Sequence, residues 1–352
     1  MTDSSTAHDP APAPDPAPAP ERPKSARRAV RARSRRLRVV AALTVVGGLT
    51  GTVASPASFA AADDASTLPT RQEAAFTSPF TGLPAEKNPV LAVKIDNHRD
   101  ARPQTALEDA DIVGVEKVEG GLGRLFAIYS SHYPETLGPV RSAREYNVEQ
   151  MRMFQRPALA YSGAREGVVD KIKKSPLYGV SHDDHPDAYE RGGDNEPPHN
   201  LYGRPDKLLD KAQGASEADD IGFRFDAEPG GGTPAEGRSV DYGSSSVSFD
   251  WSTEEDRWLA SFDGEPAKGT SGKLLGGKTV IIQKTDMPPD SSGKTPYIET
   301  VGSGEATVLR DGKAFETKWQ RKSATGDTTY TLSNGKRMPF DRGQVWLVYQ
   351  ER

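Results

Sequence analysis

The sequence contains no cysteine among its 352 residues. That absence excludes a disulfide framework, a thiolate nucleophile, Cys-ligated zinc or iron–sulfur centres, and a lipid attached through an N-terminal cysteine. Most of the chain also lacks excess positive charge: residues 1–38 hold nine Lys and Arg against four Asp and Glu, which leaves 36 against 46 for the rest. An acidic folded part disfavours nucleic-acid binding, so we predict no nucleic-acid partner.

A long hydrophobic run is missing as well. The apolar stretch 39–54 has sixteen residues, whereas a membrane-spanning helix needs about 20. Seven arginines precede it between residues 27 and 38, and small residues follow it up to Ala62. This order is typical of an export signal over 39–62, with cleavage expected after Ala60 or Ala62. An uncleaved anchor through 39–54 is the alternative, and either places the residues after about 62 outside the cytoplasm, secreted or anchored.

Changes in composition divide the chain into segments. The Pro/Ala repeat at 9–23 cannot bury a core, and the Asp/Gly/Pro-rich residues near 230 are poor in apolar side chains. The predicted order is a disordered, basic cytoplasmic tail (1–38), the signal or anchor (39–62), a polar linker (63–78), an N-terminal α/β domain (79–226), a Gly/Pro linker (227–237) and a C-terminal β-rich domain (238–352).

Apolar runs in the first domain predict strands of a layered α/β fold. The nearly continuous apolar run 90–95 is typical of a strand that is covered on both faces. Further strands are predicted at 112–118, 125–129 and 158–161, and a Gly-rich hairpin loop joins the first two of these. A helix is predicted over 164–174.

The second domain alternates apolar and polar residues instead. Val247, Phe249 and Trp251 alternate, and so do Trp258, Ala260 and Phe262, as expected of strands with one buried face. The pairs Asp311-Gly312 and Asn334-Gly335 predict hairpin turns. The aromatic stripe could form a sugar-binding platform, but core packing is the favoured interpretation.

Two motifs suggest ligands that the sequence does not support. Residues 272–279 match the phosphate-loop pattern GxxxxGKT, yet that loop must open a helix, and residues 279–283 have the pattern of a strand. The run 182–185 (His-Asp-Asp-His) contains metal-ligand side chains, but no third spaced ligand accompanies it, so we interpret it as a solvated loop. The sequence therefore predicts no nucleotide, no metal site and no cofactor.

The segment 138–145 holds the strongest signal for a ligand. Ser142 and Glu145 match a capping box, which predicts a helix from Ala143 to about residue 155. Arg141 and Arg144 would then flank the positive end of the helix dipole, where cations are unfavourable and anions are favoured. We infer an anion site there. The alternative is that internal carboxylates pair both arginines.

Other polar residues are candidates for the same site. Asp96 and Asn97 follow a buried strand, where open α/β sheets place their ligands. Arg124 follows the hairpin loop and would stand opposite Glu119 if that loop has four residues. His199 and Asn200 follow two prolines, which makes His199 a candidate proton carrier.

Several short motifs follow one another in order between residues 79 and 350. They are Pro79-Phe80-Thr81-Gly82-Leu83-Pro84, Val93-Lys94-Ile95-Asp96-Asn97, Arg102-Pro103-Gln104, Val118-Glu119-Gly120-Gly121, Gly138-Pro139-Val140-Arg141-Ser142-Ala143-Arg144, Pro198-His199-Asn200-Leu201-Tyr202, Val301-Gly302-Ser303-Gly304 and Asp311-Gly312-Lys313. The series resembles the YerB-like family of bacterial lipoproteins, which has two domains of unknown function. The resemblance implies an envelope protein with no established reaction. This chain has no cysteine to carry the lipid, so a cleaved signal or an anchor would replace it.

The sequence leaves three functions open. The favoured one is an exported envelope protein that binds an anionic small molecule or cell-wall fragment in a cleft lined by Arg124, Arg141 and Arg144 together with Asp96, Asn97, His199 and Asn200. The second is a hydrolase acting on an envelope polymer, with Asp96 or Glu119 as base and His199 as proton carrier. The third is a non-catalytic scaffold for another envelope protein, whose identity the sequence does not indicate.

Overall fold

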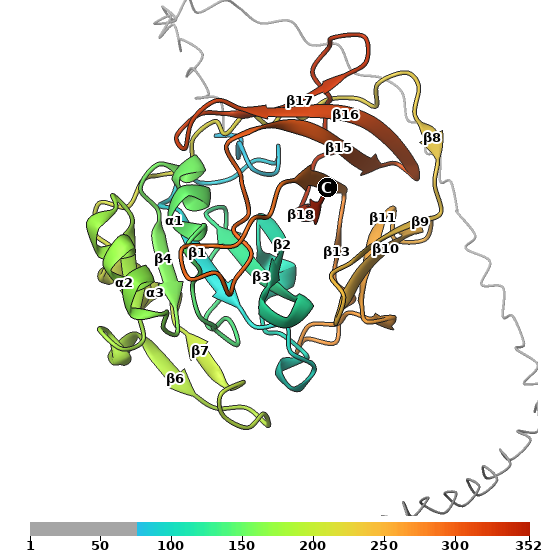
Figure 1. The fold of residues 1–352 in the computed structure, drawn as a ribbon. Coiled ribbons are helices and arrows are strands. Elements are labelled where there is room, and N and C mark those ends of the chain that lie inside the picture. The colour runs from blue at the N-terminus through green and yellow to red at the C-terminus, as the bar shows by residue number, and fades with distance from the viewer. Residues whose placement is uncertain (1–75) are drawn as a thin grey trace, which may run out of the picture. The chain divides into compact units, whose positions relative to one another are not determined.

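The computed structural model describes residues 76–352, so the predicted tail, export signal and most of the linker lie outside the described residues. No helix among the described residues is both long and apolar enough to cross a membrane. Figure 1 shows the arrangement of the strands and helices.

One sheet of eleven strands organises the described residues. Its order is β17-β16-β15-β14-β18-β2-β3-β1-β4-β5, and β8 pairs with β16 off this path. The strands are β1 (Leu91–Ile95), β2 (Ile112–Val118), β3 (Leu122–Tyr129), β4 (Ala158–Tyr161), β5 (Tyr178–Ser181), β8 (Thr233–Pro234), β14 (Thr279–Thr285), β15 (Gly302–Arg310), β16 (Lys313–Arg321), β17 (Thr328–Leu332) and β18 (Val345–Glu351).

The last strand joins the N-terminal and C-terminal parts of the chain in this sheet. β18 pairs in parallel with β2 on one side and with β14 on the other. Its first five residues are buried, as is typical of a parallel strand covered on both faces. The two predicted parts therefore share backbone hydrogen bonds within one continuous sheet.

A second, smaller sheet contains the aromatic alternation. It has the order β12-β11-β10-β9, with β13 paired to β11. Phe249, Trp258 and Phe262 are buried, and Phe249 and Phe262 both lie against Trp346 of β18. The aromatic side chains thus pack in the core rather than forming a sugar platform. The strands are β9 (Gly237–Asp241), β10 (Ser246–Ser252), β11 (Arg257–Phe262), β12 (Glu265–Pro266) and β13 (Gly276–Gly277), and a separate pair is formed by β6 (Tyr189–Arg191) and β7 (Leu201–Gly203).

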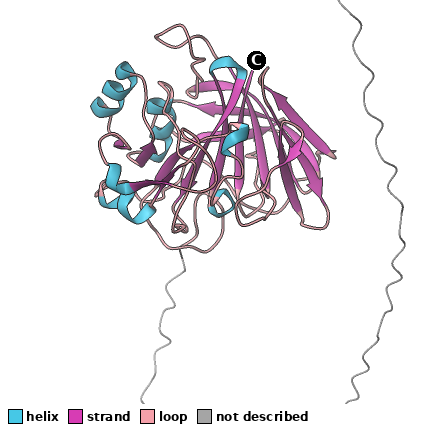
Figure 2. Ribbon diagram, turned by 90° about the horizontal axis from the view of Figure 1, so that it is seen from below, coloured by secondary structure: helices cyan, strands magenta, loops and turns pink. Residues whose placement is uncertain are grey.

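Helices are few and short, and the three α-helices lie near β4 (Figure 1), whereas short helical turns also occur elsewhere around the sheet (Figure 2). They are α1 (Asn147–Gln150), α2 (Glu166–Lys174), α3 (Pro205–Asp210), and the 3-10 turns η1 (Arg99–Ala101), η2 (Leu107–Asp109), η3 (Glu119–Gly121), η4 (Met151–Phe154) and η5 (Pro186–Ala188). From residue 237 onward the described chain is built of strands and contains no α-helix. The predicted fold, an α/β part followed by a β-rich part, is confirmed, and so is the turn at Asp311-Gly312, which joins β15 to β16.

The predicted helix from Ala143 is wrong. The helix begins at Asn147, and α1 has four residues before the backbone tightens into η4. Tertiary pairing displaces the start, because the N–H of Ala143 donates to the carbonyl of Gly163 (2.9 Å) instead of entering a helix. Glu145 cannot close a capping box because Lys171 and Ser291 bind its carboxylate.

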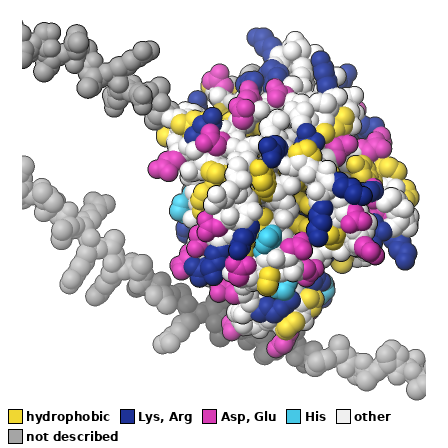
Figure 3. Space-filling view, turned by 90° about the vertical axis from the view of Figure 1, so that its left-hand side faces the viewer, with side chains coloured by type: hydrophobic (Ala, Val, Ile, Leu, Met, Phe, Trp, Pro, Cys, Tyr) yellow, Lys and Arg dark blue, Asp and Glu magenta, His cyan; other side chains and the backbone are white. Residues whose placement is uncertain are grey.

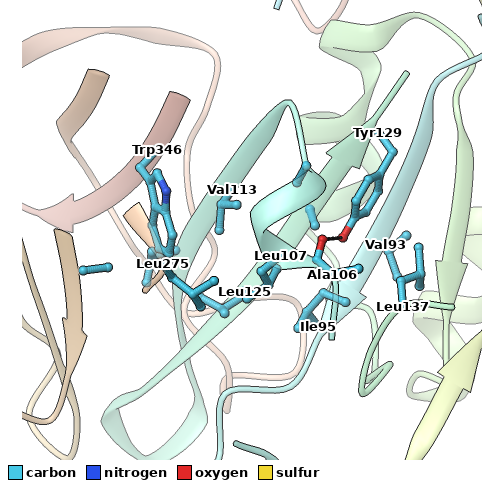
Figure 4. Packing of buried hydrophobic residues seen from close by; sticks show 14 of the residues in the cluster. Val93, Ile95, Ala106, Leu107, Val113, Leu125, Tyr129, Leu137, Leu275 and Trp346 are labelled. Carbon is cyan, nitrogen blue, oxygen red and sulfur yellow. Dashed lines mark hydrogen bonds between the residues drawn. The ribbon is translucent and has the colours of Figure 1, made fainter. Parts of the chain in front are cut away.

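The core lies on both faces of the sheet. Alternate residues of β1 show this, since Val93 and Ile95 belong to one buried cluster and Ala92 to the other. Figure 4 shows the first cluster, where Tyr129 donates a hydrogen bond to the carbonyl of Ala106 (3.0 Å). Each large apolar side chain buried in this way contributes about 1.5–3 kcal/mol. This double burial holds the end of β1, and with it Asp96, in a rigid position.

The phosphate-loop match is followed by a strand, as predicted. Thr279 begins β14, so no helix N-terminus stands beside Lys278. The Lys278 ammonium pairs with Asp256 (2.7 Å) and lies 3.6 Å from the carboxylate of Asp341. These acidic partners already compensate the charge that a phosphate would need.

Substitution of Lys278 with alanine should therefore leave the affinity for ATP at its background value. Titration calorimetry with ATP on the wild type and on Lys278→Ala measures this directly. A saturable ATP signal in the wild type that the substitution abolishes would restore the motif to a nucleotide site.

Candidate functional site

A cavity of about 320 Å³ lies at the end of β1, beside the hairpin β2–β3. Its lining residues come from segments far apart in the sequence. They are Asp96, Asn97, His98, Arg99, Arg102, Leu122, Gly123, Arg124, Arg141, His199, Ser244, Ser245 and Asp263. The cavity is therefore bounded by both parts of the chain.

The turn η3 closes one wall of this cavity. Gly121 has φ +69°, and a Cβ there would lie 2.6 Å from the carbonyl oxygen of Tyr242. Without a side chain, the turn can approach the loop between β9 and β10, where the N–H of Ser244 donates to the Gly121 carbonyl (2.9 Å). The N–H of Gly123 donates to Oγ of Ser245 (2.6 Å). These bonds hold the beginning of β3, and hence Arg124, against the second sheet.

Asp96 is a buried carboxylate with three donors. Oδ1 accepts from the N–H of His98 (3.1 Å), while Oδ2 lies 2.9 Å from Nδ1 of His199 and 3.1 Å from Nε of Arg141. Burial alone would raise the pKa of Asp96, but the charge of Arg124 and these donors outweigh it and hold the pKa below its usual value. Asp96 is therefore ionised at neutral pH, and its stabilising contribution is present above about pH 4 and is lost as the pH falls.

Arg124 is buried, and the carboxylate beside it is already engaged. The turn has three residues instead of four, so Arg124 stands opposite Glu116 in the sheet register and not opposite Glu119. Glu116 is bound by Lys94, Tyr146 and Asn147. Nη1 of Arg124 is buried and has no hydrogen-bond partner among residues 76–352. Burial lowers the pKa of Arg124, as expected for a cation taken out of water.

The two arginines of the 138–145 segment have separate environments. Arg141 lines the cavity and pairs with Asp96. Arg144 lies outside the lining and pairs with Glu119 (2.7 Å), which also accepts from Thr295 (3.0 Å). Since α1 begins three residues after Arg144 and is a single turn long, the predicted anion site at a helix N-terminus is absent from this segment of the structure. For Arg144 the alternative, an internal carboxylate partner, describes the contact.

The remaining candidates divide in the same way. Asn97 lines the cavity, and its Oδ1 accepts from Nε of Arg102 (3.2 Å) and from Gln104 (3.0 Å). His199 lines the cavity, whereas the Asn200 amide oxygen accepts from Arg191 (2.9 Å) and lies outside the lining. Glu119 is likewise not among the lining residues.

Sequence reasoning missed several lining residues. Arg102 was visible in the Arg-Pro-Gln motif, but nothing in that motif indicates that its guanidinium reaches Asp263 (2.8 Å), 161 residues away. Ser244 and Ser245 carry no local signal, because only the contact between the two sheets brings them to the cavity.

Three side chains at this edge could provide metal ligands, although the sequence predicted no metal site. His98, Asp100 and His199 place ligand atoms within 4.8 Å of one another, whereas the run 182–185 does not contribute to this group. The rings of His98 and His199 are stacked, with centroids 4.6 Å apart and planes inclined by 14°. Imidazole binds a metal ion in the plane of its ring, so two nearly parallel rings cannot both direct a lone pair at one ion. The stacked arrangement does not fit a shared metal ligand set.

Both the N-terminal and the C-terminal part of the chain are similar to known proteins. Residues 80–219 match the family described as "Protein of unknown function (DUF3048) N-terminal domain", and residues 238–347 match the corresponding C-terminal domain. "Putative lipoprotein YerB" of Bacillus subtilis (strain 168) is 28% identical over 289 residues, covering 77% of this chain and 85% of the relative. The crystal structure of the YerB protein from Bacillus subtilis superimposes with a TM-score of 0.69 at 26% identity, covering 78% of this chain and 96% of that chain.

Proposed function

Because the chain belongs to the DUF3048 family, carrying both its N-terminal and its C-terminal domain, and because a relative is named a lipoprotein, we propose that it is an extracytoplasmic protein that binds an anionic ligand in the cavity around Arg124. The order of basic, apolar and small residues up to 62 supports export. Lipid attachment through cysteine is excluded by composition, so the segment 39–54 serves as a cleaved signal or as an anchor.

The observation that carries the binding proposal is the unpartnered guanidinium of Arg124. A buried charged donor without a hydrogen-bond partner is costly, and an anion in the cavity would remove that cost. The lining contains four arginines and two aspartates, and Arg141 and Arg102 pair with those aspartates. Arg99 and Arg124 are left as the positive excess.

The face of the molecule that Figure 3 shows supports a local site instead of a broad basic face. Lys and Arg side chains are intermingled with Asp and Glu on the face shown in Figure 3. A ligand would then be selected by the cavity and its buried arginine, as expected for a small anionic molecule or the anionic end of a cell-wall fragment.

Replacement of Arg124 with methionine should abolish anion binding with little net effect on the stability of the fold. Methionine fills a similar volume and needs no counter-charge, whereas the buried Asp96 carboxylate loses the favourable charge of Arg124. The two effects oppose each other, so the variant should unfold close to the wild-type temperature. Phosphate at 100 times its Kd should stabilise the wild type by about 2.7 kcal/mol and should not stabilise the variant. Thermal melts with and without phosphate, sulfate, phosphosugars and cell-wall fragments measure both effects.

Arg144→Met is the matched control, because Arg144 is paired outside the cavity. It should lose about 1–3 kcal/mol of stability yet keep the full phosphate response. A wild type that responds to none of these anions would contradict the proposal. If Arg124→Met were destabilised as strongly as Arg144→Met, Arg124 would have a structural role and the scaffold function would be favoured.

A further inference from the structure

The imidazole of His199 is held in one orientation beside the unpartnered arginine. Its Nδ1 lies 2.9 Å from the buried, ionised carboxylate of Asp96, which accepts hydrogen bonds and cannot donate one. This contact places the imidazole proton on Nδ1 and leaves Nε2 as a proton acceptor. The stacked ring of His98 covers one face of the imidazole and restricts its rotation.

Asp96 itself is unsuited to act as a base. Both of its oxygens already accept hydrogen bonds, and its pKa is held low by Arg124 and the donors around it. Glu119, the other candidate, is engaged by Arg144 and Thr295. Of the three catalytic candidates that the sequence suggests, His199 is the one that lines the cavity with a nitrogen free to exchange a proton.

The charge of the cavity favours one class of ester. The lining has a positive excess of two charges, from the buried Arg124 and the exposed Arg99, which matches the dianion of a phosphomonoester. A phosphodiester or a carboxylate would neutralise half of it. The guanidinium fork of Arg124 suits the non-bridging oxygens of a phosphoryl group.

We propose that this cavity hydrolyses phosphomonoesters, with His199 as the general base, Asp96 as its positioning residue, and Arg124 as the ligand of the phosphoryl group. The proposal rests on the anion binding proposed above and adds a reaction to it. Among the described residues, the hydrogen bonds of the imidazole join it to Asp96 and to no serine or threonine hydroxyl, so water is the nucleophile.

The reaction balances with water as its only co-reactant. Water attacks phosphorus as its proton passes to Nε2 of His199, and a new P–O bond forms. The bond from phosphorus to the ester oxygen breaks on the opposite side of phosphorus, where the departing alkoxide takes a proton from water, and His199 releases the proton that it accepted to the solvent. The products are orthophosphate and an alcohol, and the imidazole is restored to its starting protonation state.

The test uses the exported chain with p-nitrophenyl phosphate as substrate, in EDTA, and calorimetric binding of orthophosphate as a second readout. We expect the wild type to release p-nitrophenol, and His199→Gln to lose at least 100-fold in kcat while its Kd for orthophosphate changes less than about threefold. Arg124→Met should lose both the release of p-nitrophenol and the binding of orthophosphate. His132→Gln, which replaces an exposed histidine away from the cavity, should behave like the wild type and controls for contaminating phosphatases.

The outcomes separate the two proposals. Orthophosphate binding without turnover would overturn hydrolysis and leave the binding function intact, whereas no binding at all would overturn both. Turnover that survives His199→Gln would overturn the role of the imidazole. Turnover that needs added zinc, or that is faster on bis-p-nitrophenyl phosphate, would overturn the metal-free monoesterase.

Discussion

Replacement of Glu116 with glutamine should destabilise the fold by about 3–5 kcal/mol near neutral pH. Glu116 and Lys94 are completely buried and form an ion pair. The carboxylate of Glu116 also accepts from the Tyr146 hydroxyl (3.1 Å) and the Asn147 amide (3.2 Å). The substitution leaves a buried ammonium without its counter-charge, beneath the arginines of the candidate site.

The loss should depend on pH in a defined direction. Burial lowers the pKa of Lys94 to about 8, against the opposing effect of Glu116. Between about pH 8 and the ordinary value of 10.5, the unfolded chain binds a proton at Lys94 that the folded chain has released, so this group makes stability rise across that window. At pH 9 the folded lysine is neutral and needs no partner. Glu116→Gln should therefore cost more at pH 6 than at pH 9.

Urea denaturation of the wild type and Glu116→Gln at both pH values measures the effect. The double variant Lys94→Met/Glu116→Leu is the control, because replacing a whole buried pair with apolar side chains is commonly neutral or stabilising. A loss of less than about 1 kcal/mol in Glu116→Gln, or an equal loss at pH 6 and pH 9, would contradict the stabilising role assigned to the Lys94–Glu116 ion pair.

Replacement of Gly276 with alanine should destabilise the fold by about 3 kcal/mol or more, at or beyond the upper end of ordinary overpacking. Gly276 in β13 stands opposite Leu259 of β11, and a Cβ would lie 2.0 Å from the carbonyl oxygen of Trp258. The obstructing atom belongs to the backbone, so no side-chain rotation relieves the clash. Strands β11 and β13 would have to separate.

Gly272→Ala is the matched control for Gly276→Ala, because both glycines lie within the phosphate-loop pattern at residues 272–279. Gly272 has φ +82°, and no atom lies within 4 Å of a Cβ built there, so backbone strain of about 1–2 kcal/mol is the whole expected cost. Thermal or urea unfolding of the two variants compares them. Equal losses of stability in the two variants would mean that close packing against Trp258 is not the reason for glycine at position 276.

The strands could be predicted from the sequence because their patterns are local. The run of apolar residues at 90–95 predicts β1, and the alternation at 247–251 and 258–262 predicts β10 and β11, because burial on two faces or on one face gives a pattern in consecutive residues. The same reasoning placed Asp96 and Asn97 at the end of a buried strand. It also recognised that residues 279–283 form a strand and not a nucleotide-binding helix.

The helix at 143–155 could not be predicted, because its signals compete with partners distant in sequence. Ser142 and Glu145 have the spacing of a capping box, but Lys171 and Ser291 take the carboxylate and Gly163 takes the N–H of Ala143. The spacing of capping residues indicates which helix a segment can form in the absence of tertiary contacts. Hydrogen-bond partners 20 to 146 residues away decided otherwise.

The sequence by itself determined where the strands lie, that the aromatic stripes are core, and that an arginine-rich cluster accompanies the end of β1. Only the tertiary structure decided that, within residues 76–352, Arg124 is the buried arginine of the cavity whose Nη1 has no hydrogen-bond partner. A three-residue turn sets Arg124 opposite Glu116, and Lys94 on the neighbouring strand has already bound that carboxylate. Arg144 pairs with Glu119, whereas Ser244 and Ser245 of the second sheet's β9–β10 loop line the cavity. Pairing of charges depends on strand register and on contacts between sheets, and neither is encoded by neighbouring residues alone.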